Sequence, residues 1–322
     1  MTTSDEMTKL TARPYSNEND LQPVVDLINC CSALDKLGTA TSPASLKVEF
    51  EAPEVDSVQL WEIEGKLVGM AALMELKAEE ALDGYLNYYV HPEHRQGHLE
   101  KQILEWAEAR WTKADKPQKL KRNLLTSAKT EQTAKINSLE RHGFTVIRYF
   151  LVMERSLSEA LPALALPEGF QLRQVSGEAD AERWVAMFNQ SFVDHFNFHP
   201  MTVENYLHEL NNPEYFAEND LVVVAPGGEF AAFCYLHVPE AENVQSRCRE
   251  GWIDLLGTRR GYRKMGLGKA ALLAGLRRLQ ALDMETALLS VDADSPTGAT
   301  RLYESVGFAK RSTRLRLRKS IS

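Results

Sequence analysis

The sequence of 322 residues has no apolar run near the ~20 residues that a membrane-spanning helix needs. Its first residues, MTTSDEMTKLTARPYS, show neither the basic start nor the apolar stretch of a secretory signal peptide. Basic residues are not in excess, because 37 Lys+Arg stand against 45 Asp+Glu and give a net charge of −8. A general nucleic-acid-binding surface requires the opposite balance. We therefore expect neither a membrane nor nucleic acid among the partners.

Cysteine is scarce, with four residues at Cys30, Cys31, Cys234 and Cys248. The adjacent pair Cys30–Cys31 has poor geometry for a disulfide, and no CxxC pair is present for zinc binding or redox chemistry. This usage predicts a protein of the reducing cytoplasm without a metal centre.

The composition is that of a globular protein, with 44% hydrophobic and 25% charged residues. A chain of this length is typical of two domains.

An internal duplication supports this division. Three pairs of segments recur in the same order at a separation of about 165 residues. These pairs are Glu64–Leu73 with Gly228–Leu236, Val90–Gly97 with Thr258–Gly266, and Arg141–Phe144 with Ser305–Phe308. A repeat of this length indicates two whole domains rather than a solenoid.

The duplication predicts an N-terminal domain at 1–156, a linker rich in Ala, Leu and Pro at 157–169, and a C-terminal domain at 170–322. In each half, strand-like runs alternate with amphipathic helical runs, which predicts an α/β or α+β sheet covered by helices. A helix follows Pro200, with Thr202 as its N-cap. The tail 311–319 alternates Arg with Leu. We interpret it as a closing strand with Leu315 and Leu317 inward, rather than as a nucleic-acid patch.

The most informative local pattern is GTRRGYRKMGLGKAALL, residues 257–273. A strand enters a loop with two glycines, Gly266 and Gly268, and a helix begins at once. Glycines let a ligand approach the main chain, and the unpaired amides of a helix N-terminus attract anions. Arg263, Lys264 and Lys269 add positive charge, so the loop is suited to a pyrophosphate.

The glycines also have a plainer interpretation, in which they only shape a strand-to-helix turn. The dinucleotide fingerprint G-x-G-x-x-G is absent, and so is the GK[ST] ending of a Walker A loop.

A second pattern lies about 30 residues further on, in VDADSPTGATRLYESVGF, residues 291–308. It predicts a helix over Thr297–Val306 that stops at Gly307. Leu302, Val306 and Phe308 would face the core, with Tyr303 beside that apolar stripe and directed toward a cleft. An ordinary half-buried helical tyrosine is the alternative.

Together these two patterns resemble the GNAT superfamily of acyl-CoA-dependent N-acyltransferases. The motifs that support the resemblance are R-x-x-G-x-G at Arg263–Gly268 and A-x-x-L-Y-E-x-x-G-F at Ala299–Phe308. The two-repeat layout is similar to that of tandem GNAT proteins of the mycothiol synthase type. The resemblance implies two tandem GNAT-like domains, each with a central mixed, mainly antiparallel sheet flanked by helices.

The resemblance also implies roles for individual residues. Leu256 and Thr258 would pair with the pantetheine arm of acetyl-CoA, the co-substrate, and the Leu256 amide would meet the oxyanion. Tyr303 would be the general acid that protonates the departing thiolate. The implied cofactor-binding residues are Leu256, Gly257, Thr258, Arg263, Lys264, Met265, Gly266, Leu267, Gly268, Lys269 and Ser295.

The general base is less sharply indicated. Asp254 stands two residues before Leu256, so regular alternation would direct both side chains to one face. Glu250, at the start of the strand, is a second candidate. His195 and His199 lie in a region that lines the acceptor cleft in GNAT proteins, but we favour a loop packed by phenylalanines in which the histidines are incidental. Asp194, His195 and His199 suggest metal ligands but lack a fourth ligand at a usual spacing.

The first half departs from the pattern at the same places. His98 and Glu100 stand where Gly266 and Gly268 stand, and Leu139 takes the place of Tyr303. Side chains at both loop positions would crowd a pyrophosphate, and Glu100 would repel it. We expect a degenerate first domain that neither binds CoA productively nor catalyses.

The sequence thus predicts an acetyl-CoA-dependent N-acetyltransferase that acts by direct attack of a primary amine, with its active site in the C-terminal domain. The acceptor would be a small molecule or a peptide, and the oligomeric state stays open. The alternatives are a catalytically silent acyl-CoA-binding sensor or scaffold and an enzyme that uses a nucleotide or dinucleotide.

Overall fold

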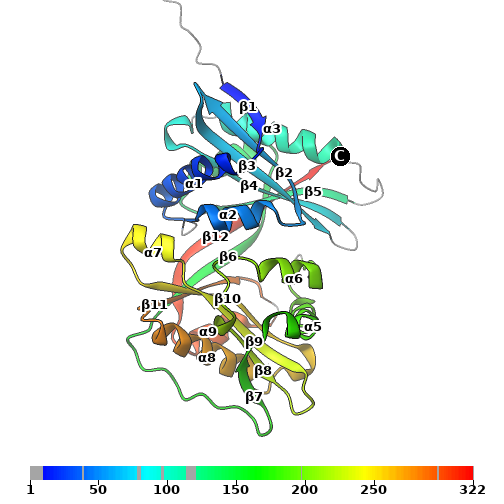
Figure 1. Ribbon diagram of the computed structural model, residues 1–322, viewed down its shortest axis with the longest axis vertical. Helices are drawn as coiled ribbons and strands as arrows, with labels where there is room; N and C mark the ends of the chain where they lie inside the picture. Colours follow the sequence, from blue (N-terminus) through cyan, green and yellow to red (C-terminus); the bar gives the residue numbers. More distant parts are fainter. Residues whose placement is uncertain are drawn as a thin grey trace, which may run out of the picture. The chain divides into compact units, whose positions relative to one another are not determined.

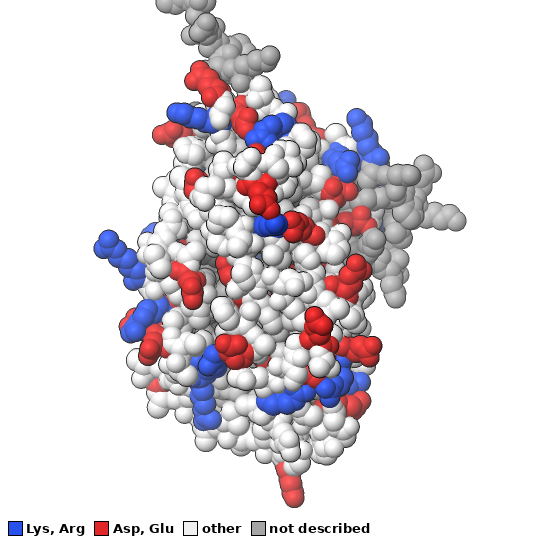
Figure 2. Space-filling model, in the orientation of Figure 1, with Lys and Arg blue, Asp and Glu red and all other residues white. Residues whose placement is uncertain are grey.

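The computed structural model describes residues 10–37, 40–77, 81–95, 98–113, 121–196, 198–295 and 297–321. The chain forms two compact units (Figure 1). The first comprises the residues up to Thr145 together with the chain end from Leu317, and the second comprises Val146–Arg316. Within the described ranges, no helix is long and apolar enough to cross a membrane. On the face drawn in Figure 2, acidic and basic side chains are intermingled and form no field of a single sign.

The elements of the first half follow the chain in a regular order. They are β1 (Leu10–Pro14), η1 (Glu18–Asp20), α1 (Leu21–Asp35), α2 (Pro43–Phe50), β2 (Val55–Ile63), β3 (Lys66–Lys77), β4 (Ala81–Val90), η2 (Pro92–His94), α3 (His98–Lys113), β5 (Lys121–Lys129), α4 (Thr133–Arg141) and β6 (Thr145–Ser156).

The second half repeats this order with two additional elements, the 3-10 helix η4 and the helix α7. Its elements are β7 (Gln171–Gln174), η3 (Gly177–Asp180), α5 (Ala181–Phe192), α6 (Val203–Glu209), η4 (Ala217–Asn219), β8 (Asp220–Val224), β9 (Phe230–His237), α7 (Glu240–Ser246), β10 (Glu250–Thr258), η5 (Arg260–Tyr262), α8 (Leu267–Ala281), β11 (Thr286–Asp292), α9 (Ala299–Glu304) and β12 (Ala309–Ile321).

Each unit has a mixed, mainly antiparallel sheet, which confirms the expected fold class. Apart from β12, which is divided between the units, the strand order is β1-β2-β3-β4-β5 in the first unit and β6-β11-β10-β9-β8-β7 in the second. In each of these runs one neighbouring pair is parallel, β4 with β5 and β10 with β11. The other pairs are antiparallel.

The compact units group the chain differently from the sequence boundaries at 156 and 170. Nearly all of β6 belongs to the second unit, where it pairs with β11 from Thr286↔Ser156 to Asp292↔Phe150. Conversely, the end of β12 belongs to the first unit. Residues 157–169 form neither helix nor strand, and their leucines Leu161, Leu164 and Leu166 pack on the core of the second unit.

Two apolar clusters cover the two faces of the second sheet. On one face, α8 and α9 pack on side chains such as Cys234 and Leu236 of β9. On the other face, Trp184 of α5 and Tyr206 of α6 pack on Phe233 of β9. This alternation along β9 is that of a strand buried on both faces. The expected N-cap, Thr202, begins α6 with a capping box.

An arginine–aspartate pair joins the first strand to the first helix in both repeats. Arg13 donates to both carboxylate oxygens of Asp20, and Arg173 does the same to Asp180. The backbone N–H of a serine between the two residues donates to the same aspartate in each repeat. Repeated pairs of this kind, each with a buried aspartate, show that the duplication extends to side-chain interactions.

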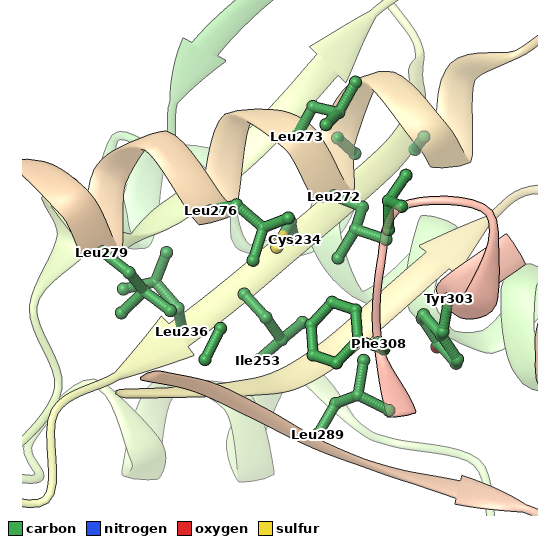
Figure 3. Packing of buried hydrophobic residues seen from close by; sticks show 14 of the residues in the cluster. Cys234, Leu236, Ile253, Leu272, Leu273, Leu276, Leu279, Leu289, Tyr303 and Phe308 are labelled. Atoms are coloured by element: carbon green, nitrogen blue, oxygen red, sulfur yellow. The ribbon is translucent and has the colours of Figure 1, made fainter. Parts of the chain in front are cut away.

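Helix α8 lies unusually close to β9, because the contact is made by a glycine. A Cβ built on Gly275 would lie 2.5 Å from the sulfur of Cys234 and 3.1 Å from Cδ1 of Ile253. Figure 3 shows α8 laid over these strand side chains, with Leu272, Leu276 and Leu279 directed into the same cluster.

We predict that Gly275→Ala destabilises the protein by about 1–3 kcal/mol, because the added methyl group overpacks this contact. The measurement is the midpoint of urea unfolding. Cys234→Ala should recover part of the loss when combined with Gly275→Ala. Gly227→Ala is the matched control, since a Cβ there meets nothing within 4 Å. Equal effects of the two glycine substitutions would contradict the close approach.

Candidate active site

The parallel strands β10 and β11 separate halfway along their length. They pair from Glu250↔Thr286 to Ile253↔Leu289, and no pair with β11 follows among the described residues. From Leu255 to Thr258, β10 pairs only with β9 on its other side. Over the stretch that contains Leu256 and Thr258, the backbone of β10 therefore has no strand partner on the β11 side among the described residues, although the Thr258 carbonyl accepts a hydrogen bond from Arg263. An extended ligand can supply the missing hydrogen bonds there.

The separation begins at a β-bulge. Ile253 pairs with Leu236 and Leu255 pairs with Tyr235, so Asp254 is the extra residue of β10. The bulge corrects the expectation that Asp254 and Leu256 share a face. Leu256 packs on the α8 side, whereas the Asp254 carboxylate is bound to Nδ1 of His237 on the α5 and α6 side. An extra residue in a strand breaks the two-residue alternation on which the expectation relied.

The loop after β10 leads directly into α8. Lys264 and Gly266 have φ angles of 64° and 81°, in the left-handed region that favours glycine. Gly266 is the N-cap and no side chain caps the helix, so the first backbone amides of α8 lack a side-chain acceptor. A Cβ on Gly266 would meet nothing within 4 Å, whereas one on Gly268 would lie 2.9 Å from Oγ1 of Thr258. The main chain is thus accessible at the first glycine.

The side chains of this loop divide into exposed and internal groups. Lys264, Met265 and Lys269 are exposed, whereas Leu267 is buried and offers only its backbone to a ligand. Gly257 also has an internal role, because a Cβ there would collide with Phe233 and with Cβ of Ser191.

Arg263 is held by protein groups. Its guanidinium donates to the Thr258 carbonyl at 3.2 Å, to the Asp194 carboxylate at 2.7 Å and to the Ser191 carbonyl at 2.9 Å. Hydrogen bonds from Arg260 and Arg263 lower the pKa of Asp194 to about 2. The charge of Arg263 is therefore balanced, and its main effect is to fasten the loop to the end of α5. Asp194, considered above as a metal ligand, is thus already bound by Arg260 and Arg263.

The first unit contains the same arrangement, which we call the arginine clasp. Arg95 donates to the Val90 carbonyl at 3.1 Å and to the Asp35 carboxylate at 2.7 Å. The repeated segments Val90–Gly97 and Thr258–Gly266 contain both arginines, but nothing in the sequence pattern indicates their carboxylate partners. Because the clasp is present in both units, its role in shaping the loop does not depend on the loop glycines.

Tyr303 lies on α9 within the apolar cluster on the α8 face. It is 7% exposed and packs edge-on against Phe308, with ring centroids 6.0 Å apart (Figure 3). It is thus more buried than the neighbouring Leu302, contrary to the expected stripe. Helix α9 also begins at Ala299 rather than Thr297, after Gly298 in a left-handed conformation.

The phenol of Tyr303 remains protonated, because burial raises its pKa, with a smaller contribution from the nearby Cys234. No hydrogen bond of the hydroxyl is found within the described ranges. Cys234 is the β9 residue that pairs with Leu256. A protonated donor therefore lies beside the separated part of β10.

Two further candidate residues have partners of their own. The hydroxyl of Ser295 is 3.0 Å from that of Thr297. The carboxylate of Glu250 accepts a hydrogen bond from Arg311 at 2.6 Å. Glu250 is therefore ion-paired at the start of β10, whereas Asp254 is at the bulge.

Sequence reasoning missed two groups on the α5 and α6 face. The first is His237, although the alternation of β9 could have placed it on one face with Tyr235. The second is Asp220, which is fully buried and accepts hydrogen bonds from Trp184 Nε1 and from the hydroxyl of Tyr215, each at 3.2 Å. Burial raises the pKa of Asp220 to about 7.

In the first unit, a side chain bridges the corresponding separation of the strands. Strands β4 and β5 also separate, after Tyr85↔Leu125. Beyond that point the hydroxyl of Thr126 donates to the Leu86 carbonyl at 2.9 Å. Tyr88 and Glu100 are both buried, and Lys135 lies 4.3 Å from the centre of the Tyr88 ring. Leu139 is fully buried at the place of Tyr303. Gln96 and Gly97 of this loop lie outside the described residues.

One group of side chains in the described part of the chain has a spacing compatible with a metal ion. It consists of His91, Glu93 and His94 of the first unit, whose ligand atoms lie within 4.8 Å of one another. It forms no part of the site of the second unit.

Some comparisons with known proteins match the second half of the chain, and others match most of its length. Residues 181–308 match the model of the Acetyltransferase (GNAT) family. Mycothiol acetyltransferase of Thermobispora bispora is 32% identical over 169 residues, which cover 52% of this chain and 56% of that protein. That of Pseudarthrobacter chlorophenolicus is 26% identical over 277 residues, which cover 85% and 80%. The chain spans about half the length of the first curated relatives it matches.

A solved structure, a tandem GNAT protein from the clavulanic acid biosynthesis pathway, aligns over 98% of this chain and 99% of its own length. Its TM-score is 0.72 at 12% sequence identity, so the likeness is one of fold. The resemblance expected from the loop and the Tyr303 motif is thereby confirmed. Residues 181–308, which hold the separated strand, the glycine loop and Tyr303, form a domain of the GNAT acetyltransferase family.

Proposed function

We propose that the second unit transfers the acetyl group of acetyl-CoA to a primary amine by direct attack. The observation that carries this proposal is the separation of β10 from β11, which leads into the accessible start of α8 and has Tyr303 alongside. The free edge from Leu256 to Thr258 would pair with the pantetheine arm. The backbone at Gly266–Lys269 would bind the pyrophosphate, with Lys264 and Lys269 as exposed cations.

The reaction then needs two proton transfers. The amine nitrogen attacks the thioester carbonyl, and the Leu256 amide binds the oxyanion. The C–S bond breaks as the C–N bond is completed, and Tyr303 gives its proton to the leaving thiolate. The proton lost by the nitrogen is taken up on the other face of β10, at the Asp254 bulge.

The proposal concerns the second unit alone. In the first unit, the Thr126 hydroxyl bonds across the separated strands, Glu100 stands at the sequence position of Gly268, and the buried Leu139 stands at that of Tyr303. We therefore propose one CoA site in each chain. The acceptor would be a small-molecule or peptide amine, and the cytoplasmic location stays a prediction from cysteine usage.

The test is release of CoA thiol from acetyl-CoA with a panel of D-glucosamine, benzylamine, spermidine and L-lysine amide. Binding of acetyl-CoA without turnover of any of these amines would favour the silent sensor. Stabilisation against heat by ATP or NAD, and not by CoA, would favour a nucleotide-using enzyme.

Tyr303→Phe should lower kcat by roughly 100-fold or more, because the thiolate loses its proton donor. The affinity for CoA, measured by calorimetry, should change by no more than about twofold, since the ring and its packing remain. Because burial raises the pKa of Tyr303, wild-type kcat should not decline below about pH 10 through its ionisation. Tyr149→Phe, at a half-exposed tyrosine, is the control. Unchanged turnover in Tyr303→Phe would remove the residue as the acid.

Gly268→Glu, which copies Glu100 of the first unit, should weaken CoA binding by roughly 100-fold. The side chain would crowd Thr258 and place a negative charge beside the phosphates. Calorimetry should give one CoA per wild-type chain, and Glu100→Gly should leave that stoichiometry unchanged. Two CoA molecules per chain would contradict the assignment to the second unit.

Arg263→Met should lower both the melting temperature and the affinity for CoA, the latter by roughly tenfold. The reason is that the clasp fixes the loop that leads into α8. Arg95→Met removes the matching clasp of the first unit and should lower the melting temperature only. Equal losses of affinity in the two variants would contradict a specific role of the second clasp.

A further inference from the structure

His237 and Asp254 form a hydrogen-bonded pair on the α5 and α6 face of the second sheet. Nδ1 of His237 is bound to Oδ2 of Asp254, across the bulge of β10. The two side chains are 25% and 33% exposed, so both are accessible to solvent. No hydrogen bond to Nε2 of His237 is found among the described residues, which leaves this nitrogen able to accept a proton.

The charges around His237 favour its protonated form. Burial alone would lower its pKa, but the hydrogen bond and charge of Asp254 and the charge of Glu214 together raise it above the ordinary value. Asp254 is bound to the ring from β10, and Glu214 lies in the segment between α6 and η4. Tyr235 precedes His237 by two residues on β9. Burial is the main cause that raises the pKa of the Tyr235 phenol, and smaller contributions come from the charges of Asp254, Asp220, Glu209 and Glu214.

A chain of aromatic contacts fixes the segment that carries Glu214. The rings of Tyr215 and Tyr235 stack with centroids 5.5 Å apart. The Tyr215 hydroxyl donates to the buried carboxylate of Asp220 and lies 3.4 Å from the hydroxyl of Tyr206. The residues around Tyr235, two positions before His237 on β9, are thus held by α6, β8 and Tyr215, and His237 itself is bound to Asp254 of β10.

We propose that His237 is the group that takes the proton from the acceptor nitrogen, and that Asp254 holds the imidazole in place. In the neutral ring, Nδ1–H donates to Asp254 and Nε2 presents its lone pair. When the nitrogen has attacked the thioester, its N–H bond breaks, Nε2 gains the proton, and the imidazolium is balanced by the Asp254 carboxylate. The proton then passes to solvent, while the separate proton of Tyr303 goes to sulfur.

The chemistry favours the ring over the carboxylate as the proton acceptor. A base is most effective when its pKa lies near the working pH, and an imidazole beside a carboxylate meets this condition better than a carboxylate alone. This inference rests on the proposed function, because it assigns an atom to one of its two proton transfers.

The experiment compares His237→Gln with wild type as a ratio of kcat/KM values between pH 5.5 and pH 9.5. The substrates are acetyl-CoA and each panel amine, and the ratio cancels the ionisation of the amine itself. Glutamine keeps a polar side chain at the position but cannot take up a proton. The ratio should be near one at low pH, where the imidazole is already protonated, and should fall to roughly one hundredth as pH rises through the His237 pKa.

Asp254→Asn supplies the second arm. Without the charge that raises the His237 pKa, the activity of this variant should rise at lower pH than in wild type. Nitrogen chemical shifts of the imidazole should show the neutral ring of wild type protonated at Nδ1, with a pKa above that in Asp254→Asn. His98→Gln, at an exposed histidine of the first unit, is the control and should leave the profile unchanged.

The outcomes separate the two proposals. A pH-independent ratio for His237→Gln in a protein that does acetylate an amine would overturn this inference and leave the proposed function standing. A larger loss in Asp254→Asn than in His237→Gln, with the profile of His237→Gln unshifted, would assign the proton to Asp254. Binding of acetyl-CoA without turnover of any amine would contradict the proposed function and this inference with it.

Discussion

The parting of β10 from β11 after Ile253 is the constraint on which the site depends. A sheet normally satisfies its backbone groups by strand pairing, and buried groups without partners cost free energy. Here the pairing stops where the Asp254 bulge adds a residue, and the arginine clasp then fixes the course of the chain into α8. The backbone edge, the helix start and Tyr303 are brought together by this one interruption.

Local patterns in the sequence predict the order of the helices and strands and the residues at the centre of the site. The Gly266 position is a clear case, because its φ of 81° is a conformation that glycine adopts without strain, and the helix formers after it specify α8. Tyr303 was identified by its place in a motif, but its burial was not, since burial depends on how Phe308 and the β9 strand pack around it.

The remainder depends on partners distant in the chain. Neither the bulge nor the opposite directions of Asp254 and Leu256 could be derived from alternation, because a bulge arises from pairing with β9. The pairing of Arg263 with Asp194, the proximity of His237 to Asp254 and the burial of Asp220 likewise join different elements of the fold. Composition and periodicity report on single elements, so such pairs become visible only in three dimensions.

Strand β12 is divided between the two units, so the first unit is completed by residues that follow the second unit in the sequence. The last residues of β12 belong to the first unit, where Lys319 is ion-paired with Glu108 and the hydroxyl of Ser320 donates to Asn123 at 3.2 Å. During synthesis, domains fold as their residues emerge from the ribosome. The N-terminal unit, although made first, must therefore wait for residues 317–321, which follow the whole of the second unit in the sequence, before its structure can close.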